Sequence, residues 1–316
     1  MRLPWRIEIL CVSSATILPQ KESTTGQVTP RVHFTYMEPD RKVIDKWNAS
    51  AAFWEKHRDA IREMFAPVAR ALVEDAQISS GNAVLDVATG PGDPALSIAA
   101  TVGPEGTVSG IDPVPGMVEA ARRAAVRQGL VNSRFEVAFA DRLPFPSETF
   151  DAVVSRFGAM FFPSPVNAGR EMLRVLKPGK TLALAVWHFA EGNPFLTTLS
   201  RALEPYVKSP PPDTDAPEVF RFATSGKLRD VLAEAGAVET KERLLRFRIE
   251  TPLAIEEFWT LRCEISDTYR EKLALLSSEQ LAEVKRNAFE TLRAYETGNG
   301  LSFPAEVLIV SGTRSR

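Results

Sequence analysis

The stretch VLDVATGPGDPALSIA, from Val84 to Ala99, decides the fold class. Its first residues are apolar and β-branched, as in a buried strand, and a helix-like run follows a short loop with two glycines. A glycine loop between a strand and a helix commonly holds a nucleotide-like ligand, although tight turns also need glycine for steric reasons alone. The stretch therefore predicts a strand, a ligand-binding loop at Gly90–Gly92 and a helix.

Strands and helices alternate after this stretch. The strands expected in this region are residues 83–89, 106–112, 133–141, 150–158 and 180–187. The helices expected between them are residues 94–102, 115–129 and 164–176. Two further strands are expected at 238–251 and 303–313. This alternation predicts an α/β, Rossmann-like fold with a seven-stranded, mostly parallel sheet covered by helices on both faces.

Four parts of the chain differ in pattern. The expected organisation is an N-terminal extension with little order (1–36), an N-terminal helical lid (37–80), a ligand-binding core (81–190) and a C-terminal remainder (191–316). Pro67 is expected to divide the lid into two helices. The remainder holds a proline-rich flap (204–217) and a pair of helices (253–296), which we expect to form a substrate cap inserted before the last strand.

Composition excludes several classes of function. The chain has 316 residues, a net charge of −2 and 25% charged residues, so nothing favours a nucleic-acid partner. Neither a membrane span nor a metal site is expected from the sequence. Cys11 and Cys263 lie far apart, which argues against a disulfide framework and favours a cytoplasmic protein. The oligomeric state, monomer or homodimer, stays open.

Three acidic residues surround the glycine loop. In an open parallel sheet, ligands bind beyond the carboxyl ends of the strands. Asp112 ends the next strand, 20 residues after Gly92, where a carboxylate accepts hydrogen bonds from ribose hydroxyls. Asp86 lies in the first strand, and Asp93 would repel a phosphate from the helix N-terminus. Together the acids favour S-adenosylmethionine, an adenosine that carries positive charge, over a dinucleotide.

Four ordered motifs extend this interpretation across residues 84–187. They read VLDVATGPG, GTVSGIDPVPGMVEAAR, FADRLPFPSETFDAVVSRFGAMFF and EMLRVLKPGKTLALAVW. In this order they resemble the class I S-adenosylmethionine-dependent methyltransferases, nearest to the bacterial small-molecule (type 11) branch with the ubiquinone/menaquinone-biosynthesis enzymes. The departures from the family pattern are small: Lys180 stands where a second glycine is frequent, and Ala88 and Thr89 replace a cysteine or glycine.

The resemblance implies a role for each motif. Asp86 and the loop backbone would face the methionine part of the cofactor, Asp112 the ribose, Met117 the adenine face and Asp141 the adenine amino group. The full set of implied cofactor-binding residues is Asp86, Ala88, Thr89, Gly90, Pro91, Gly92, Asp112, Pro113, Met117, Ala140, Asp141, Arg142, Ser155, Arg156 and Phe157. Structural alternatives stay open: Asp141 ends a strand, Met117 suits a core, and Arg156 suits a pairing with a nearby acid.

The acceptor side of the site is less well defined. His188 directly follows the fifth strand and is the best candidate for a general base among three histidines, although many relatives act by positioning alone. Aromatic residues on the lid and cap suit a substrate pocket, but aromatic residues at helical spacing are also typical of a core. The pocket residues expected are Trp54, Phe161, Phe195, Phe258 and Trp259.

These observations predict an enzyme that transfers a methyl group from S-adenosylmethionine to a small, partly apolar molecule by in-line displacement. The accepting atom, oxygen, nitrogen or carbon, stays open. Two alternatives remain: a protein methyltransferase, and a regulatory protein that binds S-adenosylmethionine without catalysis.

Overall fold

The computed structural model describes residues 41–208 and 215–316, with backbone only for residues 41 and 42. The expected N-terminal extension (1–36) lies outside the described residues, as does the middle of the proline-rich flap (209–214). Within the described residues, no helix is both long and apolar enough to cross a membrane.

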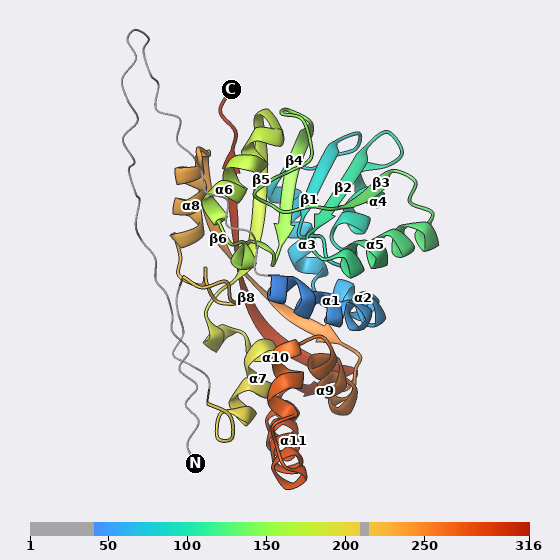
Figure 1. Ribbon diagram of the computed structural model, residues 1–316, viewed down its shortest axis with the longest axis vertical. Coiled ribbons are helices and arrows are strands. Elements are labelled where there is room, and N and C mark those ends of the chain that lie inside the picture. The colour runs from blue at the N-terminus through green and yellow to red at the C-terminus, as the bar shows by residue number, and fades with distance from the viewer. Residues whose placement is uncertain (1–40, 209–214) are drawn as a thin grey trace, which may run out of the picture. The chain divides into compact units, whose positions relative to one another are not determined.

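A mixed sheet forms the centre of the fold (Figure 1). Its strand order is β3-β2-β1-β4-β5-β8-β6, with the short β7 paired to β8. The strands are β1 (Ala83–Val87), β2 (Thr107–Asp112), β3 (Ser133–Val137), β4 (Phe150–Arg156), β5 (Leu176–Trp187), β6 (Val238–Thr251), β7 (Glu296–Thr297) and β8 (Gly300–Thr313). Along the seven-strand path, β8 runs antiparallel to both of its neighbours and the other pairs are parallel. This arrangement confirms the predicted fold class.

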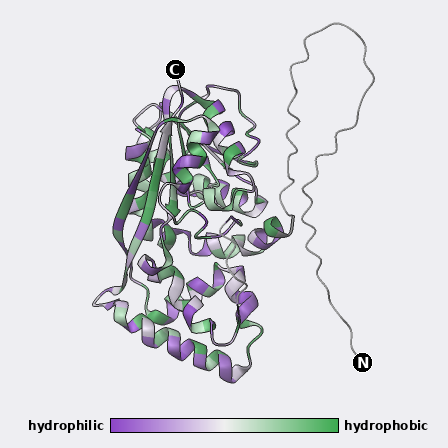
Figure 2. Ribbon diagram, turned by 90° about the vertical axis from the view of Figure 1, so that its left-hand side faces the viewer, coloured by the Kyte–Doolittle hydropathy of each residue, from purple (hydrophilic) through white to green (hydrophobic). Residues whose placement is uncertain are grey.

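The central strands are covered on both faces. Leu85 and Asp86 are consecutive, so their side chains point to opposite faces, and neither is exposed to solvent. The same holds for Val153 and Val154 on β4. Figure 2 shows apolar residues concentrated along the strands and an alternation of apolar and polar residues along the lowest helix, α11 (Ser278–Leu292). Helices along the sheet are α4 (Ala95–Val102), α5 (Pro115–Gln128), α6 (Pro165–Val175) and α8 (Lys227–Ala235).

The N-terminal segment forms three helices rather than two. They are α1 (Arg41–Lys56), α2 (Arg58–Met64) and α3 (Ala66–Asp75). Pro67 lies in the first turn of α3, where its missing N–H has no helical partner to lose, so the break expected there is confirmed. The additional break at His57 has no comparable signal in the sequence.

The helical cap also holds three helices rather than the expected pair. They are α9 (Ile255–Glu264), α10 (Asp267–Leu273) and α11. The extra break occurs at Ser266, whose Oγ accepts a hydrogen bond from the backbone N–H of Tyr269 (3.3 Å) and begins α10. Asn193 is the N-cap residue of α7 (Pro194–Leu203), which begins at Pro194. Figure 1 shows α7 and α9–α11 gathered below the sheet, with α1 and α2 between them and the strands.

Candidate active site

The loop after β1 has a backbone that requires glycine. Gly90 and Gly92 both have left-handed conformations, with φ of 54° and 109°. A Cβ on Gly92 would lie 2.9 Å from Leu96 Cδ1 and 3.2 Å from Ala121 Cα. The second glycine therefore lets the loop pass close to Ala121 of α5 and to the first turn of α4.

Asp86 is a fully buried carboxylate beneath this loop. Its Oδ2 accepts hydrogen bonds from Thr89 Oγ1 (2.7 Å) and the backbone N–H of Ala95 (3.1 Å). Its Oδ1 is buried and has no partner among the described residues. Burial, reinforced by the charge of Asp93, raises the pKa of Asp86 to about 7, although Thr89 and Arg156 act in the opposite direction.

Asp112 fixes the other side of the loop. Its Oδ2 accepts a hydrogen bond from the backbone N–H of Gly90 (2.9 Å), and its Oδ1 accepts one from Val114 (3.0 Å). Burial raises the pKa of Asp112 to about 6, and the two backbone hydrogen bonds oppose this rise. Because a carboxylate has about four acceptor positions, both oxygens retain capacity for ligand hydroxyls.

Asp93 does not contribute free negative charge, in contrast to the expectation from the sequence. It forms a buried ion pair with Arg156 (Nη1 to Oδ2, 2.6 Å), and its Oδ1 accepts a hydrogen bond from Ser97 Oγ (2.6 Å). Arg156 also donates a hydrogen bond to the Asp93 carbonyl (2.9 Å). Arg156 therefore pairs with a nearby acid, which is the structural alternative that the sequence left open. Among the described residues, the acids at the loop that form no ion pair are Asp86 and Asp112.

A second buried polar atom without a partner among the described residues lies at the end of β4. Ser155 is fully buried, and its Oγ has no partner among the described residues. Ser155 follows Val154, the residue of β4 that pairs with Asp86 on β1, so the two polar groups lie at adjacent strand ends but on opposite faces of the sheet. A buried carboxylate oxygen without a donor, as at Asp86, fits a ligand that carries N–H groups and positive charge, as S-adenosylmethionine does.

The residues predicted to bind adenine lie at the ends of β2 and β3. Met117 is buried on α5 and packs against Ala51 of α1. Asp141 is half-buried in a tight turn closed by the Arg142 N–H and the Phe139 carbonyl (3.1 Å), so β3 ends before the range predicted for it. Half-buried neighbours on the same segments are Pro113 and Ala140.

An aromatic cluster continues from β4 toward the cap. Phe157, in a left-handed conformation (φ 61°), stacks on Trp187 with centroids 4.4 Å apart. Phe65, between α2 and α3, contacts Phe157 at 5.3 Å and Phe195 at 5.6 Å. Phe195 in turn contacts Phe258 at 5.5 Å. Phe65 and Trp187 were not predicted as site residues, because helical and strand patterns mark them only as core.

The other predicted pocket residues separate into two places. Trp54 and Phe161 both contact Trp47 of α1, at 6.1 and 5.5 Å. Trp54 also donates its indole N–H to the Ile265 carbonyl (3.1 Å). The ring of Trp259 instead lies against a phenylalanine of α11. The structure thus brings Trp54 and Phe161 together at α1 and places Trp259 within the cap.

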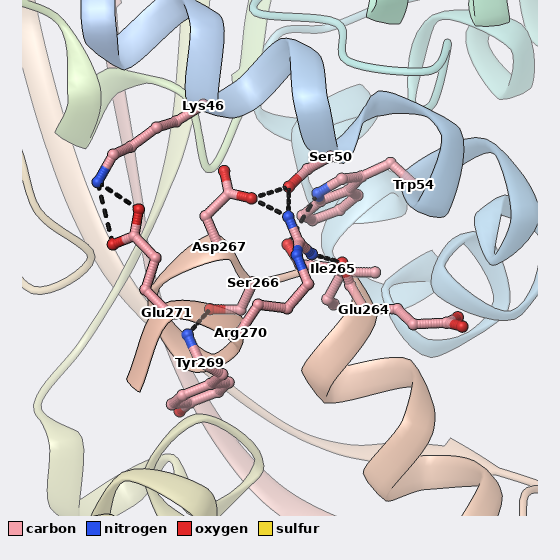
Figure 3. Close-up of polar contacts among 10 residues, drawn as sticks. All are labelled: Lys46, Ser50, Trp54, Glu264, Ile265, Ser266, Asp267, Tyr269, Arg270 and Glu271. Carbon is pink, nitrogen blue, oxygen red and sulfur yellow. Dashed lines mark hydrogen bonds and ion pairs between the residues drawn. The ribbon is translucent and has the colours of Figure 1, made fainter. Parts of the chain in front are cut away.

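Polar contacts fasten α1 to α10 (Figure 3). Ser50 Oγ donates to Asp267 Oδ1 (2.7 Å) and accepts from Arg270 Nη2 (2.7 Å). Arg270 also pairs with Asp267, and Lys46 pairs with Glu271 at 2.8 Å. The N-terminal helices and the inserted cap therefore form one continuous cover, although more than 200 residues separate them in sequence.

His188 lies at the carboxyl end of β5 with an oriented imidazole. Its Nδ1 is 2.9 Å from Glu306 Oε2, and Arg246 Nε donates to Glu306 Oε1 (2.9 Å). These two contacts hold the pKa of Glu306 below its usual range. A carboxylate on Nδ1 favours the tautomer that leaves Nε2 as an acceptor, which is the form needed in a general base.

The fold and the loop define a Rossmann-like domain of the methyltransferase type. Residues 84–179 match the family described as methyltransferase domain. The chain is 34% identical over 184 residues to a ubiquinone/menaquinone biosynthesis C-methyltransferase of Pseudomonas putida, covering 56% of this chain and 70% of that protein. The chain therefore belongs to the class I S-adenosylmethionine-dependent methyltransferases.

Two further comparisons agree with this membership. An aklanonic acid methyltransferase of Streptomyces is 36% identical over 135 residues, or 42% of this chain, and the chain spans 61% of that relative's length. The crystal structure of the YcgJ protein of Bacillus subtilis superposes with a TM-score of 0.53 at 20% identity, covering 79% of this chain and 99% of that one. The similarity to the YcgJ structure is a similarity of fold.

The raised pKa of Asp86 predicts a pH-dependent stability of the ligand-free protein. The carboxyl has a pKa of about 7 in the fold against an ordinary 3.8, so the folded state binds this proton more tightly. The contribution of this tightly bound proton to the free energy of unfolding is fully present below about pH 4 and is lost as the pH rises through 7. Asp86→Asn should flatten the dependence by about 2–4 kcal/mol over this range.

Denaturant unfolding at several pH values measures this difference. The matched control is Asp45→Asn, because Asp45 is exposed on α1. Parallel pH profiles for the wild type and Asp86→Asn would contradict the assignment.

Proposed function

We propose that this methyltransferase transfers a methyl group to a small, partly apolar acceptor. The observation that carries the proposal is the unpartnered, buried Asp86 Oδ1 at the end of β1, together with an aromatic cluster that runs from the end of β4 to a helical cover. When bound, S-adenosylmethionine supplies the methyl group on a positively charged sulfonium. The charged neighbourhood of Asp86 and the apolar cover suit a reaction between a cation and a ring-bearing molecule.

In this proposal the cofactor-binding residues act through the loop and the ends of β1, β2 and β4. Asp86 and the loop backbone hold the methionine part, and Asp112 holds the ribose. Met117 covers the adenine, and Asp141 accepts from its amino group. The remaining residues proposed for the cofactor are Ala88, Thr89, Pro113, Ala140, Arg142, Ser155, Arg156 and Phe157.

The acceptor would lie between the N-terminal helices and the cap. Contacts from α1 to α10 tie the two parts into one lid, and such a lid excludes water from the reacting atoms. The proposed acceptor residues are Trp54, Phe161, Phe195, Phe258 and Trp259. Two relatives named for small-molecule methylation, of aklanonic acid and in ubiquinone/menaquinone biosynthesis, support a small, quinone-like acceptor.

Calorimetric titration with S-adenosylmethionine tests cofactor binding first. We expect the wild type to bind, and Asp112→Ala to weaken binding about tenfold or more because two charge-assisted hydrogen bonds are lost. Circular dichroism verifies that the variant is folded, since Asp112 also holds the Gly90 and Val114 amides. Absence of binding by the wild type would refute the proposal, and unchanged affinity in Asp112→Ala would refute the ribose role.

His188 is proposed as a general base for acceptors that are protonated at neutral pH. A labelled-methyl screen of phenols, quinols, amines and aromatic acids identifies an acceptor and measures turnover. With a phenolic acceptor, His188→Ala should lower kcat about 100-fold at pH 7 while the affinity for S-adenosylmethionine stays unchanged. The deficit should shrink above the pKa of the phenol, where no base is needed. Full activity of His188→Ala at pH 7 would remove this role.

A further inference from the structure

Arg262 of α9 is a buried cation without a counter-charge among the described residues. The residue is 7% exposed, and its Nε is buried without a hydrogen-bond partner. No described residue forms a hydrogen bond or an ion pair with its guanidinium. A buried, unpaired charge destabilises a fold, so a chain that retains one commonly uses it to bind a ligand.

The groups around Arg262 are aromatic or already engaged. Its guanidinium carbon lies 4.6 Å from the ring centre of Phe195 and 5.6 Å from that of Tyr269. Glu264, on the same helix, pairs with Lys56 (2.7 Å) and His57 (2.5 Å). The Tyr269 hydroxyl is hydrogen-bonded to Ser200 Oγ and to the Leu196 carbonyl of α7, so no described group near Arg262 supplies the missing anion.

Aromatic contacts connect Arg262 to the end of β4. Phe195, which lies under the guanidinium, contacts Phe65, and Phe65 contacts Phe157. Arg156 contacts the same series of rings farther from Arg262, with its guanidinium carbon 5.8 Å from the ring centre of Phe65. Arg262 therefore lies at the cap end of the aromatic cluster whose other end is Ser155–Phe157, beside the candidate cofactor site.

We propose that Arg262 binds a carboxylate on the methyl acceptor, so that the natural acceptor is an aromatic acid. This inference rests on the proposed function, because it specifies the substrate class of the same site. A guanidinium presents a planar fork that matches a carboxylate, and the flanking rings provide apolar contact for the aromatic body of the acid. The carboxylate of the acceptor would supply the counter-charge that the Arg262 guanidinium lacks among the described residues.

The probes for this proposal are matched acids and amides that differ only in charge. Benzoate, 1-naphthoate and 2-anthroate are titrated into the protein saturated with S-adenosylhomocysteine, each beside its neutral carboxamide. We expect at least one acid to bind about tenfold or more tightly than its amide. Arg262→Met should remove this preference, and Arg201→Met, at an exposed position of α7, should keep it.

Thermal unfolding separates ligand binding from a structural role. Because Arg262→Met replaces an unpaired buried charge by an apolar side chain of similar length, its Tm should equal or exceed that of the wild type. A lower Tm with an unchanged acid preference would overturn the proposal, as would a wild type that binds no acid better than its amide. Failure to bind S-adenosylhomocysteine would count against the proposed function instead, since the comparison of acid and amide remains measurable without it.

Discussion

The buried carboxylate of Asp86 is the constraint around which the site is built. A carboxylate removed from water must find donors or become neutral, and here one oxygen has two donors while the other has none. The donors come from the loop and the first turn of α4, so the carboxylate fixes the path of the chain after β1. The glycines allow that path, and Asp112 holds it from the adjacent strand.

This arrangement explains why one acid is paired and another is not. Arg156 neutralises Asp93 in a buried ion pair, which anchors the start of α4 to the end of β4. Asp86 keeps one oxygen without a partner among the described residues. The negative potential is therefore concentrated at Asp86, while the charge of the neighbouring Asp93 is neutralised. This distribution suits a ligand with a localised positive charge.

The cover over this point is assembled from distant parts of the chain. Helix α1 is fastened to α10 by Ser50 and Lys46, and to α5 by Asn48, whose side chain accepts the Gly116 N–H (2.9 Å). Aromatic rings from α2–α3, β4, β5 and α7 meet beneath it. A reaction at this place would proceed among apolar rings rather than in water.

The sequence predicted the sheet well because buried parallel strands have an unmistakable apolar pattern and glycine loops mark their ends. It also predicted where Asp86, Asp112 and Ser155 would lie, since each follows from its position on a strand. It left open that Arg156 pairs with a nearby acid but did not identify Asp93 as that acid, because the two residues lie 63 positions apart and meet only when β1 and β4 pair. Phe65 and Arg262 were missed for the same reason: their neighbours come from other elements, and the local pattern shows only a helix.

The central claim is that Asp86 is held for a positively charged ligand, and proton release on binding tests it most directly. Titration calorimetry with S-adenosylmethionine at pH 6.5, in buffers of different ionisation enthalpy, gives the number of protons released. Since Asp86 has a pKa of about 7 without ligand, a bound cation should ionise it, and the wild type should release more protons than Asp86→Asn. Equal proton release by the two proteins would contradict the account.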